Sequence, residues 1–417
     1  MGKTIRGAAL LAVLISACGG EAEVIPPPQA PPPPAPVAAP PPEPTPAPAP
    51  EPPKPSLLEL EKQSAKNGLA ALNAHEAAKF AEGFAPDGVS ITYGFGENKG
   101  REAIASDIQK FFDGFPDFKI GESHVYAKGE TVVIEWVMNG THKGEFMGIK
   151  PTGKPVGVRG ATMLWMAADG LIKQEHRYMD GSTLMAQLGQ IKNPARPVPA
   201  LPSGDPTWHV AKGVPDEDKQ SDIVKGMYSA FEKKSEADFT GPMADNATWS
   251  DITMPKDVTG KIESKKFFQA FTKAFPDGKI AVDAIFSVDE FTLAESTMNG
   301  THNGPLGPLK ATKKPVSLHA LDVMTLKDGK IQAGTGYSNS VELLAQTGLL
   351  PKPKAAKTDV KADGDKKPAD KGAGDKGAEK KPADKAEKTD KAPAAKTEKP
   401  APKGDAPKTD APKSDKK

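Results

Sequence analysis

The pentapeptide MNGTH occurs twice in this chain of 417 residues, at 138–142 and again, letter for letter, at 298–302. Further matches surround both copies in the same order and at a spacing of 159 or 160 residues. They are FPD at 115–117 and 275–277, KPV at 154–156 and 314–316, and LMAQLG at 184–189 against LLAQTG at 343–348. Self-similarity at so long a period indicates that one domain has been duplicated in tandem.

Each copy reads as a domain in which helices precede a run of strands. In the first copy, residues 57–84 have helical spacing, whereas residues 131–142 alternate between apolar and polar side chains as a strand does. The other expected elements are a helix at 100–112, strands at 156–166 and 172–180 joined by a tight turn at Asp169 and Gly170, and a closing helix at 182–188. This order predicts an α+β fold: two tandem cone-shaped α+β barrels, each a curved, antiparallel-rich sheet covered by helices.

The repeat also sets the expected domain boundaries. We place the first domain at 56–192 and the second at 214–350, with a linker at 193–213 where prolines cluster. A strongly bent sheet capped by a helix encloses a pocket, which is a usual place for a small ligand.

The first 17 residues read as a secretory signal. Lys3 and Arg6 precede an apolar run at 8–15, which is too short to span a bilayer. The run ends in the letters ISAC, which resemble a bacterial lipobox, so we expect lipidation at Cys18, the new N-terminus. Ordinary signal cleavage, with Cys18 incidental, is the alternative. The prediction is an exported protein, lipid-anchored in the bacterial cell envelope and in the outer membrane where the cell has one.

Two segments of biased composition flank the repeated domains. Of the 43 prolines, 18 lie at 25–55, so residues 18–55 are expected to be a proline-rich spacer. Residues 351–417 contain 20 lysines and 13 acidic residues, which gives this tail a charge of +7 and leaves −6 for the rest of the chain. Both segments are too poor in apolar residues to form a core, so we expect them to be disordered.

The charge distribution limits the partners that the protein can bind. The folded part is acidic, which argues against binding to nucleic acid, because nucleic-acid binding needs a basic face there. The lysine-rich tail is either a solvated extension or a weak contact to anionic envelope polymers.

The most specific motifs of the first copy are GTHxGxFxG at 140–148, PTGK at 151–154, DGxIxxEHxxxD at 169–180 and the closing QLG at 187–189. In combination they resemble the SnoaL-like polyketide cyclases, often called ester cyclases, of the nuclear-transport-factor-like α+β superfamily. The resemblance implies a cofactor-free and metal-free intramolecular aldol closure, in which a pocket aspartate removes a proton and returns it. By position that aspartate is Asp180.

The residues themselves support a site and also offer a structural alternative. In the strand at 172–180, period two places Gln174, His176, Tyr178 and Asp180 on one face, which we expect to line the pocket, with His176 assisting Asp180. Asp180 also precedes the closing helix, a natural N-cap position, and the second copy has Asn339 there, which caps equally well but cannot act as a base.

Trp136 and His142 lie on the apolar face of the strand expected at 131–142. Each is expected either to line the pocket or to pack in the core. For His142 we favour a structural role, because the second copy keeps this histidine. The second copy lacks His176, which is replaced by Thr335, so it is expected to be degenerate. The histidines show no metal-ligand spacing, so no metal site is expected.

Two functions follow from these features. We favour a non-catalytic binding or scaffolding lipoprotein whose first cone holds a small, mostly apolar ligand, because polyketide intermediates are made in the cytoplasm and this chain is predicted to be exported. The alternative is an aldol-type cyclase, isomerase or hydrolase that uses Asp180. Members of the resembling superfamily commonly pair through their sheets, so the two copies are expected to form a pseudo-dimer within one chain.

Overall fold

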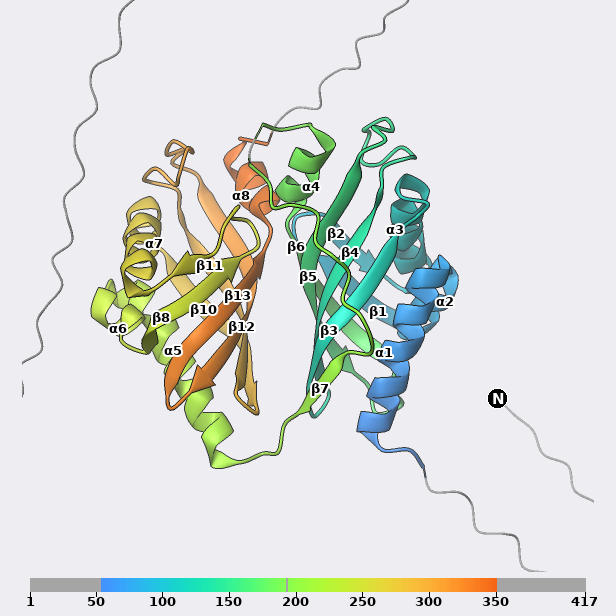
Figure 1. The fold of residues 1–417 in the computed structure, drawn as a ribbon, viewed down its shortest axis with the longest axis horizontal. Coiled ribbons are helices and arrows are strands. Elements are labelled where there is room, and N and C mark those ends of the chain that lie inside the picture. Colours follow the sequence, from blue (N-terminus) through green and yellow to red (C-terminus); the bar gives the residue numbers. More distant parts are fainter. Residues whose placement is uncertain (1–53, 193, 351–417) are drawn as a thin grey trace, which may run out of the picture. The chain divides into compact units, whose positions relative to one another are not determined.

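The computed structural model describes residues 54–192 and 194–350. The predicted signal sequence, Cys18, nearly all of the proline-rich spacer and the lysine-rich tail lie outside the described residues. Both copies of the repeat belong to one compact unit (Figure 1). Within the described part of the chain, no helix has the length and apolar character needed to cross a membrane.

The first copy, with the strand that follows it, is called the first cone here. Its sheet has the order β2-β1-β6-β5-β4-β3-β7, in which only the pairs β1–β6 and β3–β7 are parallel. The elements are α1 (Leu57–Ala74), α2 (Ala77–Glu82), β1 (Phe84–Thr92), β2 (Gly96–Lys99), α3 (Arg101–Gly114), β3 (Lys119–Lys128), β4 (Thr131–Thr141), β5 (Pro155–Met166), β6 (Ile172–Met179), α4 (Gly181–Leu188) and β7 (Thr207–Val210).

The second copy, called the second cone, repeats this architecture. Its six strands have the order β10-β11-β12-β13-β8-β9, and the pair β13–β8 is again parallel. The elements are α5 (Pro215–Lys233), α6 (Glu236–Thr240), β8 (Met243–Asp251), β9 (Val258–Thr259), α7 (Lys261–Ala274), β10 (Lys279–Val288), β11 (Phe291–Thr301), β12 (Pro315–Lys327), β13 (Lys330–Ser338) and α8 (Ser340–Thr347). The predicted α+β fold with tandem cones is therefore confirmed.

The helix expected at 57–84 is divided in the structure. Ser56 caps α1 in a capping box with Glu59, and the helix ends at His75, whose φ of 60° places it in the left-handed region. The chain then starts α2 and enters β1. The strands β1, β2 and β3 were not predicted, because Gly88, Gly96 and Gly121 and a bulge after Glu122 interrupt their alternation.

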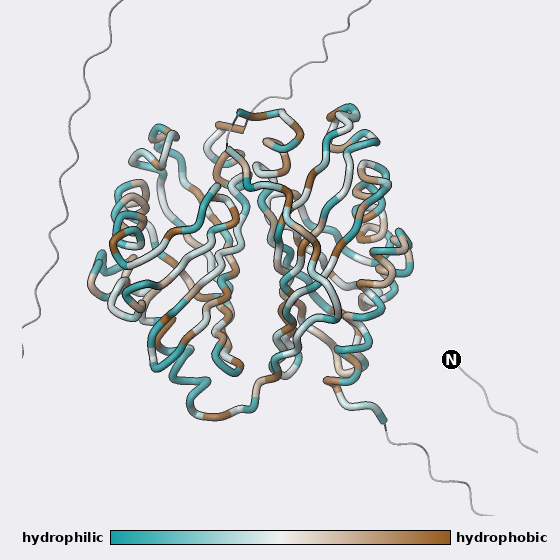
Figure 2. Tube along the Cα trace, in the orientation of Figure 1, coloured by the Kyte–Doolittle hydropathy of each residue, from teal (hydrophilic) through white to brown (hydrophobic). Residues whose placement is uncertain are grey.

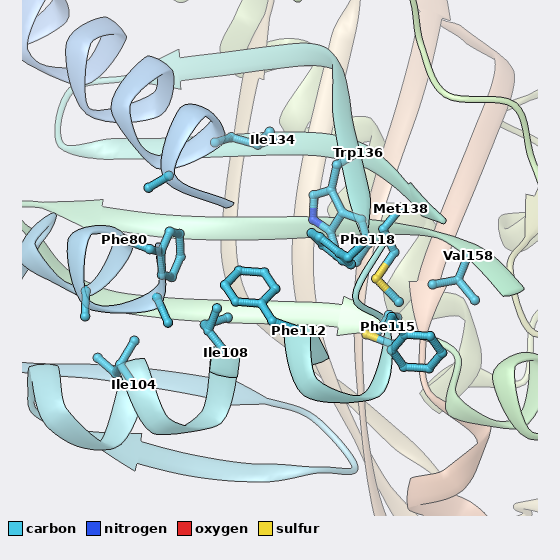
Figure 3. Packing of buried hydrophobic residues seen from close by; sticks show 14 of the residues in the cluster. Phe80, Ile104, Ile108, Phe112, Phe115, Phe118, Ile134, Trp136, Met138 and Val158 are labelled. Atoms are coloured by element: carbon cyan, nitrogen blue, oxygen red, sulfur yellow. The ribbon is translucent and has the colours of Figure 1, made fainter. Parts of the chain in front are cut away.

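The helices cover one face of each sheet, and a hydrophobic core fills the space between them. Ile134, Trp136 and Met138 of β4 point into this core, as the alternation of residues 131–142 predicts, and meet Phe112 and Phe118 from the helical side (Figure 3). Figure 2 shows apolar positions alternating with polar ones along the strands of both sheets.

The other face of each sheet is also buried, because the two sheets pack against each other. One apolar cluster contains Tyr126, Val133 and Met163 of the first sheet together with Leu293 and Leu321 of the second. Strand β3 contacts β10, β6 contacts β13, and α4 contacts α8. Figure 1 shows α4 beside α8 between the two sheets. The two sheets thus share one interface that runs through the middle of the unit.

A buried acid on α1 yields a first testable prediction. Glu61 is 3% exposed, its Oε1 has no hydrogen-bond partner among the described residues, and burial raises its pKa to about 7. The unfolded pKa is about 4.3, so the stability that this group contributes is complete below that pH and is lost as the pH rises through 7. Gln220 occupies the equivalent position of α5, where its side-chain amide donates to the carbonyl of Asp289.

Glu61→Gln is therefore expected to raise the melting temperature by a few degrees at pH 8.5, which corresponds to about 1 kcal/mol, and to change it little at pH 5. Thermal unfolding of both proteins at the two pH values measures the difference. An equal shift at both pH values would show that Glu61 does not titrate in the native state.

Candidate ligand cavity in the first cone

A cavity of about 100 Å³ lies between α1, α3 and the sheet of the first cone. Its wall is mostly apolar, and much of the cluster in Figure 3 belongs to it. The side chains that line it come from α1 (Ser64, Ala65, Gly68, Leu69, Leu72), the α2–α3 region (Phe80, Ile108, Phe111, Phe112, Phe118) and the sheet (Ile120, Glu122, Ile134, Trp136, Met138, Thr162, Leu164, Ile172, Glu175, Arg177, Met179).

The cavity exists because helix α1 carries smaller side chains over its sheet than the equivalent helix α5 of the second cone. Helices α1 and α5 align on their left-handed C-cap residues, His75 and Lys234. On that alignment the cavity-lining residues of α1 are each replaced by a larger one in α5. The pairs are Ser64 and Ile223, Ala65 and Val224, Gly68 and Met227, Leu69 and Tyr228, and Leu72 and Phe231. The larger side chains are buried or packed against the core of the second cone, so the same space is filled there.

One wall of the cavity carries a buried ion pair. Nη2 of Arg177 donates to Oε2 of Glu175 at 2.7 Å, and the Ser90 hydroxyl donates to the same oxygen at 2.5 Å. Both charged side chains are at most 11% exposed. Such a pair is stable in an apolar wall only while both partners are present.

The second cone has replaced this ion pair with an aromatic ring. The residues equivalent to Glu175 and Arg177 are Gly334 and Gly336, and Trp249 stands in the place of Ser90. A Cβ atom on Gly334 would lie 2.2 Å from the Trp249 ring, so the ring packs directly on the backbone there. The polar wall is thus specific to the first cone.

Trp136 forms the aromatic wall of the cavity. Its Nε1 donates to the Thr162 hydroxyl at 2.9 Å, and a Cβ atom on Gly160 would lie 2.2 Å from its ring. The second cone has Ser296 and Ala320 at the positions of Trp136 and Gly160. The structure therefore places Trp136 at the cavity, and at the same time in the core.

Glu122 of β3 also lines the cavity, although it was not among the site residues expected from the sequence. It pairs directly across the strands with Trp136. It makes no hydrogen bond or ion pair with any residue that the structure describes. Burial raises the pKa of its carboxyl to about 7. The signal that could have found it is the internal comparison, because the equivalent residue in the second copy is Val282.

Three of the predicted pocket residues point away from this cavity. We expected Gln174, His176 and Tyr178 to line the pocket; the structure places their face of β6 toward the second cone. The opposite face, with Glu175 and Arg177, lines the cavity. Parity alone could not tell the two faces apart, because a second sheet buries the face that would otherwise be exposed.

These three side chains take part in contacts between the cones. Nδ1 of His176 lies 2.6 Å from Oε1 of Glu295, and the Tyr178 hydroxyl donates to the same oxygen at 2.6 Å. The amide nitrogen of Gln174 lies 2.6 Å from the other ring nitrogen of His176. Burial, followed by the charge of Glu295, raises the pKa of Tyr178 far above its usual value, so this hydroxyl stays a donor.

The contact of Tyr178 has a counterpart on the other side of the interface. The hydroxyl of Tyr337, which is the equivalent of Tyr178, donates to Oε1 of Glu135 at 2.5 Å, and Glu135 is the equivalent of Glu295. A reciprocal contact of this kind is what a two-fold interface produces.

Asp180 lies outside this cavity and caps two helices; it lines a separate pocket of about 30 Å³ with Thr183 and Arg196. Its carboxylate accepts from the backbone N–H groups of Ser182 and Thr183 at 3.3 and 2.8 Å, at the start of its own helix α4. It also accepts from the backbone N–H of Ser340 at 3.1 Å, at the start of α8 in the other cone. Asn339 repeats the arrangement: its side-chain oxygen accepts from Val341 of α8 and from Gly181 of α4, both at 3.0 Å. Asp180 therefore makes the hydrogen bonds that the capping alternative requires.

His142 is fully buried but does not line the cavity. Its Nδ1 accepts from the backbone N–H of Thr152 at 3.2 Å, and burial lowers its pKa. His302 with Thr312 and a lowered pKa repeats the arrangement. The structure thus places both histidines at a loop junction. In the part of the chain that the structure describes, no group of three or more His, Cys, Asp or Glu side chains is placed to hold a metal ion.

The chain belongs to the SnoaL-like polyketide cyclase family, whose profile matches residues 64–188 and again residues 222–347. The two matches coincide with the two cones, so the duplication and the family are shown together. No curated protein sequence matches the chain.

Several solved structures are similar to single copies of the repeat. AclR, a putative hydroxylase from Streptomyces galilaeus, is 23% identical; the alignment covers 33% of this chain and 99% of AclR, with a TM-score of 0.30. IdmH, a putative polyketide cyclase from Streptomyces antibioticus, is 28% identical over 31% of this chain and 98% of its own, with a TM-score of 0.28. A putative SnoaL-like polyketide cyclase from Jannaschia sp. CCS1 is 23% identical over 32% and 95%, with a TM-score of 0.29.

Proposed function

We propose that the first cone binds one small, mostly apolar molecule in the cavity beside Trp136, and that the second cone is its non-binding partner. The observation that carries this proposal is the paired difference between α1 and α5. Five cavity-lining residues of α1 are each replaced by a larger side chain in α5, so two copies of one fold differ in whether the interior is open. A pocket with apolar walls and a few convergent polar groups is a typical ligand site.

The size of the cavity limits the ligand to one ring or a short chain. A dry apolar cavity of about 150 Å³ holds benzene, and this cavity of about 100 Å³ is of the same order. Its polar groups, Glu122, Thr162 and the Glu175–Arg177 pair, would contact one end of such a molecule while the aromatic walls enclose the rest.

The arrangement of Asp180 favours binding over the aldol chemistry of the alternative. A proton-accepting group must come within hydrogen-bond reach of the ligand. Asp180 does not line the cavity, and both its oxygens already accept hydrogen bonds from helix N-termini. A carboxylate in this position supports the fold of both cones.

The cellular setting remains part of the proposal. Lipidation at Cys18 would anchor the protein in the bacterial envelope, with the proline-rich spacer holding the cones away from the membrane and the lysine-rich tail free to contact anionic polymers. The cones themselves would act as an intramolecular pseudo-dimer, which the reciprocal Tyr178–Glu295 and Tyr337–Glu135 contacts support.

Filling the cavity is expected to abolish ligand binding. Benzyl alcohol should raise the melting temperature of the full chain, because a molecule that binds only the native state stabilises it. Leu69→Tyr places in α1 the residue that α5 carries at the equivalent position, and the phenol ring should occupy the site. The expected result is loss of the benzyl alcohol shift in a protein that still melts cooperatively.

Lys66→Tyr is the matched control. Lys66 lies one turn before Leu69 on the same helix, but its side chain is exposed and does not line the cavity. It should keep the full shift. If benzyl alcohol stabilised Leu69→Tyr as much as the wild type, the ligand would bind elsewhere and the proposal would fail.

A further inference from the structure

Glu122 differs in its surroundings from the other acid in the cavity wall. Glu175 is compensated by Arg177 at 2.7 Å and by the hydroxyl of Ser90. Glu122 has neither a cation nor a hydrogen-bond donor among the described residues. It is the one uncompensated carboxyl among the side chains that line this cavity.

An uncompensated carboxyl in an apolar wall is costly to ionise, since the charge loses part of its hydration and gains no partner. Glu122 is partly buried in this wall. Its raised pKa of about 7 expresses that penalty. A ligand that brings its own positive charge would remove the penalty, whereas a neutral ligand would leave it and an anionic ligand would add repulsion. The cavity is therefore expected to discriminate between ligands by charge.

Trp136 adds a second feature that favours a cation. Glu122 and Trp136 are direct cross-strand partners on β3 and β4, and both line the cavity. Side chains in such a pair start about 5 Å apart, so a cation held by the carboxylate lies beside the indole ring. Ammonium groups are attracted to the face of tryptophan more strongly than to other aromatic rings.

We propose that the ligand of the first cone is a small amine, with one ring or short chain as its apolar body and a protonated amino group that pairs with Glu122 beside Trp136. The apolar body extends toward Gly68 and Leu69 of α1. This inference rests on the proposed function, since it names the ligand class of the same cavity. The second cone, with Val282 and Ser296 at the two positions, offers neither the carboxylate nor the ring.

The test compares benzylamine with benzyl alcohol, which has the same shape and no charge, by calorimetry on the full chain. If only the ionised carboxylate binds the amine, a pKa of about 7 requires the affinity for benzylamine to rise about tenfold between pH 6 and pH 8. Over this range benzylamine stays protonated, and benzyl alcohol should show no such rise. At pH 6 the binding of benzylamine releases the proton of Glu122 to the buffer. The measured binding enthalpy should therefore change with the ionisation enthalpy of the buffer.

Glu122→Gln keeps the shape of the side chain and removes its charge. It should lower the affinity for benzylamine about tenfold or more at pH 8 and abolish the rise in benzylamine affinity between pH 6 and pH 8. Glu122→Val, the residue of the second cone, should act in the same way and guards against a folding defect in either variant.

The outcomes separate the two claims. Binding of benzyl alcohol without any preference for benzylamine, or an amine affinity that survives Glu122→Gln, would overturn the amine inference and leave the cavity function standing. Failure of both probes to bind the wild type would overturn the cavity function and the inference with it.

Discussion

Replacing Asp180 with alanine is expected to lower the free energy of unfolding by about 2–4 kcal/mol, because one carboxylate caps two helices and a lost cap is worth about 1–2 kcal/mol. The backbone N–H groups of Thr183 and Ser340 would each lose an acceptor, and the site is buried, with Asp180 only 1% exposed. Buried donors without a partner add to the loss. Urea unfolding of the full chain, followed by circular dichroism, measures the change.

Asp180→Asn should behave differently, because Asn339 performs the same capping on the other side of the interface. We expect it to destabilise the protein less than Asp180→Ala, because the amide keeps one acceptor oxygen for a helix N-terminus, and to keep the binding of benzyl alcohol. Asn339→Ala is the matched control, since it removes the reciprocal cap and should destabilise to a similar degree. A stable Asp180→Asn protein that has lost a ligand-dependent activity would show a chemical role for the carboxylate and contradict the capping account.

Glu295→Ala is the second substitution with a large expected effect. Glu295 is 4% exposed, accepts from the Tyr178 hydroxyl and lies against Nδ1 of His176. Its removal takes the acceptor from the buried Tyr178 hydroxyl and leaves Nδ1 of His176 with the Tyr93 hydroxyl at 3.3 Å. We expect a loss of about 2–4 kcal/mol. A double-mutant cycle with Tyr178→Phe should give a coupling energy of about 1–3 kcal/mol, since the two residues are in direct contact.

The reciprocal pair supplies the comparison for this cycle. Glu135 accepts from Tyr337 of the second cone and from Tyr126 of its own sheet. Glu135→Ala with Tyr337→Phe should show coupling of the same sign and similar size. If both cycles gave coupling near zero while each protein stayed folded, the cones would not be held together by these contacts in solution, and the pseudo-dimer would be refuted.

The fold could be predicted from the sequence because the chain contains two copies of the domain, which could be compared with each other. The alternation of residues 131–142 predicted β4 and its apolar face, and the order and spacing of the repeated motifs excluded chance similarity between the two copies. Strand β3 was missed because Gly121 and the bulge after Glu122 break the period of two. Glu122 was lost with it, although Val282 in the second copy marks it as a difference between the cones.

The site was predicted less well because sequence periodicity gives two faces of a strand without saying what covers each. His176 and Tyr178 are polar residues on one face of β6, which is equally typical of a pocket wall and of a polar contact between two sheets. Asp180 is both the family's expected acid and an N-cap, and only the contact to Ser340 across the interface shows how its carboxylate is used. Likewise the cavity depends on five size differences between α1 and α5, whose effect appears only when the helices are placed over their sheets.

One cone of the chain is open to a ligand and the other is filled. Fluorine NMR of the full chain with 4-fluorobenzyl alcohol distinguishes the two cones. We expect one saturable bound resonance per chain. It should disappear in Gly68→Met, which places in the first cone the side chain that Met227 supplies in the second. The resonance should persist in Asn67→Met, which puts the same side chain at the neighbouring exposed position. Two bound resonances of similar population, or one that survives Gly68→Met, would contradict the account.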